Sequence, residues 1–123
     1  LVKGAYKEDP SIAYQSKADV DRNYMAFVQL MLQRWGKNKN IIGIGTHDET
    51  IVRAVQAASG TKERCEFEML YGIKSGLQRQ IAGRGYKMRV LISYGTHWFP
   101  WYMRRLAERP ANVWFVMKNL VNK

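Results

Sequence analysis

Two adjacent arginines near the end of the chain, Arg104 and Arg105, have the residue type and spacing to bind a small acid. They follow an aromatic run, His97-Trp98-Phe99-Pro100-Trp101, inside a helix-forming stretch. An arginine side chain binds a carboxylate through two parallel hydrogen bonds, in a planar geometry that lysine does not reproduce. Paired arginines beside aromatic residues therefore suggest a pocket for a carboxylate. On pattern alone the basic face of an exposed helix is the simpler interpretation, so the place of this helix in the chain matters.

Length and composition bound the kind of protein. The chain has 123 residues, enough for one domain, and its 46% hydrophobic content can supply a core. The lone Cys65 excludes an intramolecular disulfide and is typical of a reducing compartment, so we expect a cytoplasmic protein. No apolar run approaches membrane-spanning length, and no secretory leader is recognisable. Because Leu1 lies inside an apolar run, we expect a fragment or a chain whose beginning is missing.

The formal net charge of +10 would attract nucleic acid, an anionic cofactor or an acidic membrane surface. Lysines and arginines are nevertheless spread along the whole chain, with no block of five or more. Dispersed charge indicates a solvated surface, so we expect no specific nucleic-acid binding. A general attraction to phosphates or anionic lipids remains open.

Short apolar runs alternate with amphipathic stretches along the chain. The expected strands are residues 1–6, 41–45, 66–70 and 88–92, and the expected helices are residues 19–35, 48–59, 75–83, 98–109 and 113–121. The run 41–45 is continuous, as in a strand buried on both faces, and residues 75–78 have the spacing of a helix capping box. Strands that alternate with helices predict parallel pairing with right-handed crossovers.

This order fits an open doubly wound sheet or part of a (β/α)8 barrel. No G-x-G-x-x-G sequence opens any of the helices, which weakens the dinucleotide-binding alternative. A closed barrel needs eight strand–helix units and about 250 residues, so this chain would supply half of one.

In parallel α/β proteins the chemistry gathers at the carboxyl ends of the strands. Here those segments are residues 3–6, 46–48, 70–72 and 93–95. Lys3 with small neighbours allows an ammonium and backbone N–H groups to approach a phosphate or a flavin edge. Taken singly, Lys3 reads as a surface lysine and His47 as a helix-start residue bonded to backbone. Their recurrence at equivalent positions of successive units suggests a shared site.

Other chemistries fit poorly. Cys65 begins an expected strand and has no histidine nearby in sequence, so we do not expect a thiol nucleophile. His47 and His97 have no metal-ligand spacing, and no metal is expected. The default role of Asp48 and Glu49 at a helix start is to offset the helix dipole. Redox chemistry on a bound organic cofactor needs only positioning and electrostatics from the protein, which suits this inventory.

Five motifs occur in the order and near the spacing found in proline dehydrogenases: LVKGAY at 1–6, GTHD at 45–48, FEMLYG at 67–72, YG at 94–95 and RRLAERPAN at 104–112. The chain resembles the monofunctional bacterial enzymes most closely, because the loop between Gly95 and Arg104 is short. The resemblance covers essentially the whole chain, and its first and last motifs are the specific ones.

The resemblance implies a flavoenzyme on a (β/α)8 barrel. Such an enzyme oxidises L-proline to 1-pyrroline-5-carboxylate and passes electrons from FAD to a membrane quinone, with peripheral association at the inner membrane face. Residues 1–123 would form a single partial domain, the last four strand–helix units, with a terminal helix that closes the substrate pocket. The N-terminal half-barrel would come from outside these residues.

The resemblance also assigns roles to individual residues. The implied cofactor contacts are Lys3, Gly4, Ala5, Thr46, His47, Glu108 and Asn112. The implied substrate contacts are Tyr6 against the proline ring, Arg104 and Arg105 on the carboxylate, and Leu70, Leu91 and Trp101 as pocket walls. Among these, Tyr6, Arg104 and Arg105 would be the catalytic residues.

Two departures from the family pattern stand out. The family has an arginine immediately before the LVKGAY motif, and Leu91 occupies the position of a pocket tyrosine. Selectivity between proline and hydroxyproline therefore stays open, as do the oligomeric state and the electron acceptor. The alternatives are a half-barrel fragment without activity of its own and, from the charge alone, an anion- or nucleic-acid-binding module.

Overall fold

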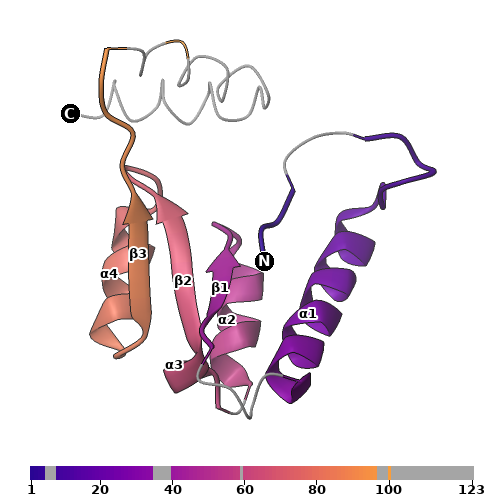
Figure 1. Cartoon of the computed structure of the whole chain (residues 1–123), viewed down its shortest axis with the longest axis horizontal. Helices are drawn as coiled ribbons and strands as arrows, with labels where there is room; N and C mark the ends of the chain where they lie inside the picture. Colours follow the sequence, from indigo (N-terminus) through magenta and orange to yellow (C-terminus); the bar gives the residue numbers. More distant parts are fainter. Residues whose placement is uncertain (5–7, 35–39, 59, 97–99, 101–123) are drawn as a thin grey trace. The chain divides into compact units, whose positions relative to one another are not determined.

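The computed structural model describes residues 1–4, 8–34, 40–58, 60–96 and 100. The chain divides into two compact units, Leu1–Ile92 and Ser93–Lys123. The elements of the first unit are α1 (Lys17–Arg34), β1 (Ile42–Gly45), α2 (Glu49–Ala57), α3 (Thr61–Arg64), β2 (Cys65–Leu70), α4 (Ser75–Gly83) and β3 (Lys87–Leu91), as drawn in Figure 1.

The three strands form one parallel sheet in the order β1-β2-β3. The start of the chain pairs beside β1, because Val2 forms an isolated parallel bridge with Gly45. The Lys3 N–H donates to the Gly45 carbonyl at 3.0 Å, and the Gly45 N–H donates to the Leu1 carbonyl at 2.8 Å. The predicted α/β alternation and parallel pairing are therefore confirmed, with the first strand reduced to a bridge.

Side-chain alternation explains how an acid-containing segment becomes β2. Cys65, Phe67 and Met69 are buried on one face, whereas Glu66 and Glu68 lie half-buried on the other. Figure 1 shows α2 and α4 on the same side of the sheet. Since apolar side chains pack under these helices, the acidic positions occupy the face that the described helices leave uncovered.

The strand β1 differs from its prediction in one respect. Ile42 and Ile44 are buried, but Gly43 and Gly45 on the opposite face are only half-buried. The expected burial on both faces therefore holds for one face among the described residues. Gly43 accepts a close neighbour there, since a Cβ at this position would lie 2.9 Å from Glu68 Oε1.

The core lies between the sheet and its helices. Its fully buried side chains include Val28 from α1, Val55 from α2, Phe67 from β2 and Ile81 from α4. Phe67 packs edge-on against Tyr86, with ring centroids 5.6 Å apart and an interplanar angle of 72°. This packing fixes the positions of the strand ends on which the candidate site depends.

The start of α2 agrees with the sequence, and the start of α4 does not. Asp48 is the N-cap of α2, and its side chain accepts from the Thr50 N–H at 3.0 Å. The capping box predicted at residues 75–78 is wrong, because α4 begins after Lys74, which has φ +52° and makes no side-chain cap. Gln78 donates instead to main-chain carbonyls outside the helix, as described below. The short helix α3 was not predicted.

Several predicted features fall elsewhere. The end of the first helix at Trp35 and the predicted helices 98–109 and 113–121 lie outside the described residues. In the second unit the predicted turn at Tyr94-Gly95 agrees with φ +106° at Gly95. Among the described residues, no helix is long and apolar enough to cross a membrane.

Candidate functional site

The segments that the sequence singled out meet at one edge of the sheet. Parallel strands end on the same side, and Thr46-His47 follow β1 there, while Leu70 and Leu91 are the last residues of β2 and β3. Leu70 and Leu91 are partners in the register. The bridge of Val2 to Gly45 brings Lys3 and Gly4 to this edge as well.

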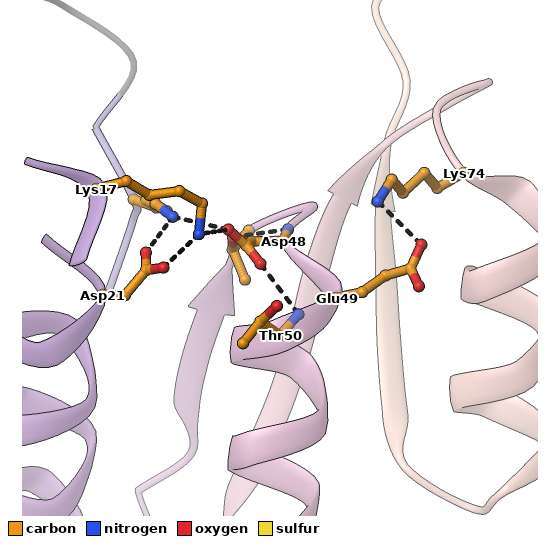
Figure 2. A network of polar contacts seen from close by, with 8 residues as sticks. Lys17, Asp21, Asp48, Glu49, Thr50 and Lys74 are labelled. Carbon is orange, nitrogen blue, oxygen red and sulfur yellow. Dashed lines mark hydrogen bonds and ion pairs between the residues drawn. The ribbon is translucent and has the colours of Figure 1, made fainter.

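Four charged side chains form a lysine–aspartate cluster at this edge: Lys3, Lys17, Asp21 and Asp48. Lys3 Nζ donates to Asp21 and, at 2.9 Å, to Asp48 Oδ2. Lys17 Nζ pairs with the same two carboxylates, at 2.9 Å from Asp48 Oδ2. Figure 2 shows how the cluster joins the first turn of α1 to the start of α2.

The cluster keeps its carboxylates ionised. Burial acts to raise the pKa of Asp48, but hydrogen bonds from Lys3 and Lys17 outweigh it and hold this pKa well below its usual range. Hydrogen bonds from Lys17 and Lys3 likewise lower the pKa of Asp21. The Lys3 side chain is only 15% exposed, so its charge is held by two carboxylates inside the structure. Lys3 is not the freely solvated lysine that its sequence context alone suggested.

His47 ties the end of β1 to the end of β2. Its Nε2 accepts a hydrogen bond from the Leu70 N–H at 3.0 Å, which requires an unprotonated Nε2. Burial, and then the nearby Lys74, lower the pKa of His47. The ring is therefore neutral at pH 7 with its proton on Nδ1, and this N–H is a donor of fixed orientation. The sequence correctly suggested a histidine bonded to backbone, but its partner lies on another strand.

The remaining described residues of the predicted cofactor set are Gly4 and Thr46. Thr46 is buried, and its Oγ1 accepts from the Asp48 N–H at 3.1 Å, which leaves its own O–H as a donor. A Cβ at Gly4 would meet no heavy atom within 4 Å, so a flat group can approach this backbone closely. Together with the Nδ1–H of His47, this donor-rich, unobstructed set fits a flavin cofactor with phosphate groups.

Leu70 and Leu91 supply the apolar part of the edge. Leu70 is half-buried and Leu91 is 59% exposed, and both lie on the face that the described helices leave uncovered. The Tyr71 N–H donates to the Leu91 carbonyl at 2.9 Å, which continues the pairing of the two strands past Leu70.

The other predicted site residues lie outside the described residues: Ala5, Tyr6, Trp101, Arg104, Arg105, Glu108 and Asn112. The sequence reasoning missed two contributors to the edge, Asp21 and Gln78. The only local signal for Asp21 was its position four residues after Lys17, the spacing of a helical ion pair. Gln78 gave a misleading signal, since it resembled part of a capping box.

Comparison with known proteins agrees with this arrangement. The family model described as proline dehydrogenase matches residues 1–118. Proline dehydrogenase 1 of Bacillus subtilis (strain 168) is 39% identical over 127 residues, which cover 100% of this chain and 41% of that protein. The proline dehydrogenase of Deinococcus radiodurans is 43% identical over 125 residues, which cover 98% of this chain and 39% of that protein. The chain thus spans about two-fifths of the length of these relatives. A family match over nearly every residue, with the matched motifs at the carboxyl edge of a parallel sheet, means that this chain belongs to the proline dehydrogenase family.

Proposed function

We propose that this chain forms the C-terminal half of the catalytic barrel of an FAD-dependent proline dehydrogenase. The proposed reaction is the oxidation of L-proline to 1-pyrroline-5-carboxylate in proline catabolism. The observation that carries the proposal is the family match over residues 1–118. Three parallel strands and the Val2 bridge, each followed by a helical or site-bearing segment, are in keeping with the last four units of a (β/α)8 barrel.

The substrate is a small zwitterion, and the proposed roles follow from its two ends. Arg104 and Arg105 bind the carboxylate as paired forks, which fixes the orientation of the ring. Tyr6, Leu70, Leu91 and Trp101 form walls that exclude water and hold the pyrrolidine ring. The chemistry that bound FAD supplies is acceptance of a hydride from the substrate carbon.

The cofactor contacts are proposed for Gly4, Ala5, Thr46, His47, Glu108 and Asn112, with Lys3 in a supporting place. Because Asp21 and Asp48 hold the Lys3 ammonium, its contribution is to fix the strand end that carries Gly4. His47 would present its Nδ1–H, and Thr46 its hydroxyl, as donors to an anionic or carbonyl group of the cofactor.

The proposed electron acceptor is a membrane quinone, and the proposed location is the cytoplasm with peripheral contact at the inner membrane face. The net charge of +10 supports such contact, because basic surfaces are attracted to anionic lipid head groups.

A chimera tests the function. Residues 1–123 would replace the aligned segment of the Deinococcus radiodurans relative, with that relative unmodified as the control. We expect a flavin absorbance spectrum and proline-dependent reduction of an artificial electron-accepting dye. A folded, flavin-loaded chimera that proline does not reduce would refute the proposal, whereas a folded chimera without flavin would refute the cofactor assignment.

The same chimera separates the alternatives. An inactive fragment predicts a folded chimera without dye reduction. A nucleic-acid-binding module predicts that the 123-residue chain binds DNA with an affinity that falls steeply as salt is added. Weak, salt-insensitive DNA binding would exclude the second alternative.

A further inference from the structure

Two side chains hold the main chain of Leu70 from opposite sides. His47 Nε2 accepts from the Leu70 N–H at 3.0 Å, and Gln78 Nε2 donates to the Leu70 carbonyl at 2.9 Å. We call this arrangement the Leu70 bracket. It is unusual for the last residue of a strand to have both main-chain polar groups bound by side chains, because most such groups bind other backbone or water.

Gln78 is committed to this task. It is only 9% exposed, and its second amide N–H donates to the Ile73 carbonyl at 2.8 Å. Both hydrogens of the amide are therefore used on the connection between β2 and α4. A buried glutamine in an otherwise apolar helix face costs desolvation, which these two hydrogen bonds offset.

The connection that Gln78 holds contains unusual backbone conformations. Gly72 has φ +77°, and Lys74, which is not a glycine, has φ +52°. Lys74 Nζ also donates to Glu49 Oε1 at 3.0 Å, shown on the right of Figure 2. A left-handed non-glycine residue persists where its surroundings fix it, so Gln78 and Glu49 together define the path of the chain after Leu70.

We propose that His47 and Gln78 are positioning residues that fix the Leu70 side chain as a rigid wall of the substrate pocket. This inference rests on the proposed function, in which Leu70 lines the proline site and His47 contacts the cofactor. His47 thereby links the two sites, since one ring nitrogen holds Leu70 while the other faces the cofactor. Discrimination between ring-substituted prolines then depends on the bracket.

Gln78→Met is the main test variant, since methionine keeps the length of the side chain and removes both donors. Gln80→Met is the matched control, because Gln80 lies exposed on the same helix. In the chimera we expect Gln78→Met to raise KM for proline about tenfold, the effect of a methylene-scale misfit in an apolar pocket. The flavin content and kcat should stay near the parent values, and the preference for proline over 4-hydroxyproline should fall.

A second readout needs no cofactor and no turnover. Hydrogen exchange of the Leu70 amide in the 123-residue chain should be faster by tenfold or more in Gln78→Met than in Gln80→Met. It should also be faster in His47→Leu than in His47→Gln, whose amide oxygen can still accept from the Leu70 N–H. This second pair decides the question if Gln78→Met does not fold.

The outcomes separate this inference from the proposed function. A parent chimera that proline does not reduce refutes the function. An active parent with the same KM, proline preference and Leu70 exchange in Gln78→Met and Gln80→Met refutes the bracket alone. Equal Leu70 exchange in His47→Leu and His47→Gln also refutes it. A KM rise matched by an equal loss of flavin would mean that Gln78 has only a structural role.

Discussion

Leu70 and Leu91 lie opposite each other in the parallel register of β2 and β3, each as the last residue of its strand. They form an apolar pair at the edge where the polar segments Lys3-Gly4 and Thr46-His47 also end. Leu91, at 59% exposure, has room beside it for a larger side chain. This position is the one at which the sequence departs from its family, where a pocket tyrosine is expected.

The first prediction concerns substrate choice. Leu91→Tyr in the chimera should tighten proline binding and penalise 4-hydroxyproline, because tyrosine fills the space beside the ring. A methylene-scale difference in an apolar pocket is worth about 1–3 kcal/mol, so the change should be a modest factor. Ile92→Tyr, at the neighbouring exposed position, serves as the control. If the ratio of the two specificity constants is the same in both variants, Leu91 does not face the substrate.

The second prediction concerns the arginine pair. Arg104→Lys or Arg105→Lys keeps the charge and removes the planar fork, so KM for proline should rise more than kcat falls. Loss of a charge-assisted hydrogen bond costs roughly 1.5–3 kcal/mol, a ten- to hundredfold weaker substrate. Flavin content should be unchanged, as in Arg84→Lys, an exposed control. Unchanged proline kinetics with lost flavin would assign these arginines to the cofactor.

The third prediction concerns Asp48, which caps α2 and pairs with Lys3 and Lys17. Asp48→Asn keeps an oxygen for the cap and removes the charge, whereas Asp48→Ala removes both. The alanine variant should lose a further 0.5–2 kcal/mol or so of stability, the usual cost of a missing N-cap. Urea unfolding of the 123-residue chain measures both variants. Equal stability in the two would mean that the cap bond contributes nothing.

The cluster also predicts a pH dependence. The pKa values of Asp48 and Asp21 in the folded chain lie below their ordinary value of 3.8. Stability from these carboxylates is therefore complete above about pH 4–5 and is lost as the pH falls through and below that value. Unfolding measured from pH 6 down to pH 3 should show a shallower loss for Asp48→Asn than for the parent. Parallel profiles would contradict this assignment.

The fourth prediction concerns the chain by itself. Val2, Leu91 and Ile92 are 75%, 59% and 57% exposed, and β3 pairs with β2 alone among the described strands. Unpaired strand edges and apolar surface favour association with other chains. We expect the isolated 123-residue chain to self-associate in light scattering. A monodisperse monomer that melts cooperatively in calorimetry would contradict this.

Local pattern in the sequence determined the elements and their order. The β-branched run before Gly45 and the alternation from Cys65 to Leu70 specify strands, and Asp48 specifies a helix start. These signals are short-range, because side-chain periodicity and capping depend on residues a few positions apart. The family motifs likewise indicated the edge at which site residues gather. The roles of Tyr6, Arg104 and Arg105 remain predictions from the sequence.

Only the tertiary structure decided which of these residues touch. Lys3 meets Asp48 across 45 positions, and His47 meets the Leu70 N–H across 23. Gln78, which the local pattern placed in a capping box, instead donates to two carbonyls outside its helix. The physical reason is that a buried polar group must find a partner wherever packing brings one, and that packing depends on the register of strands far apart in the sequence.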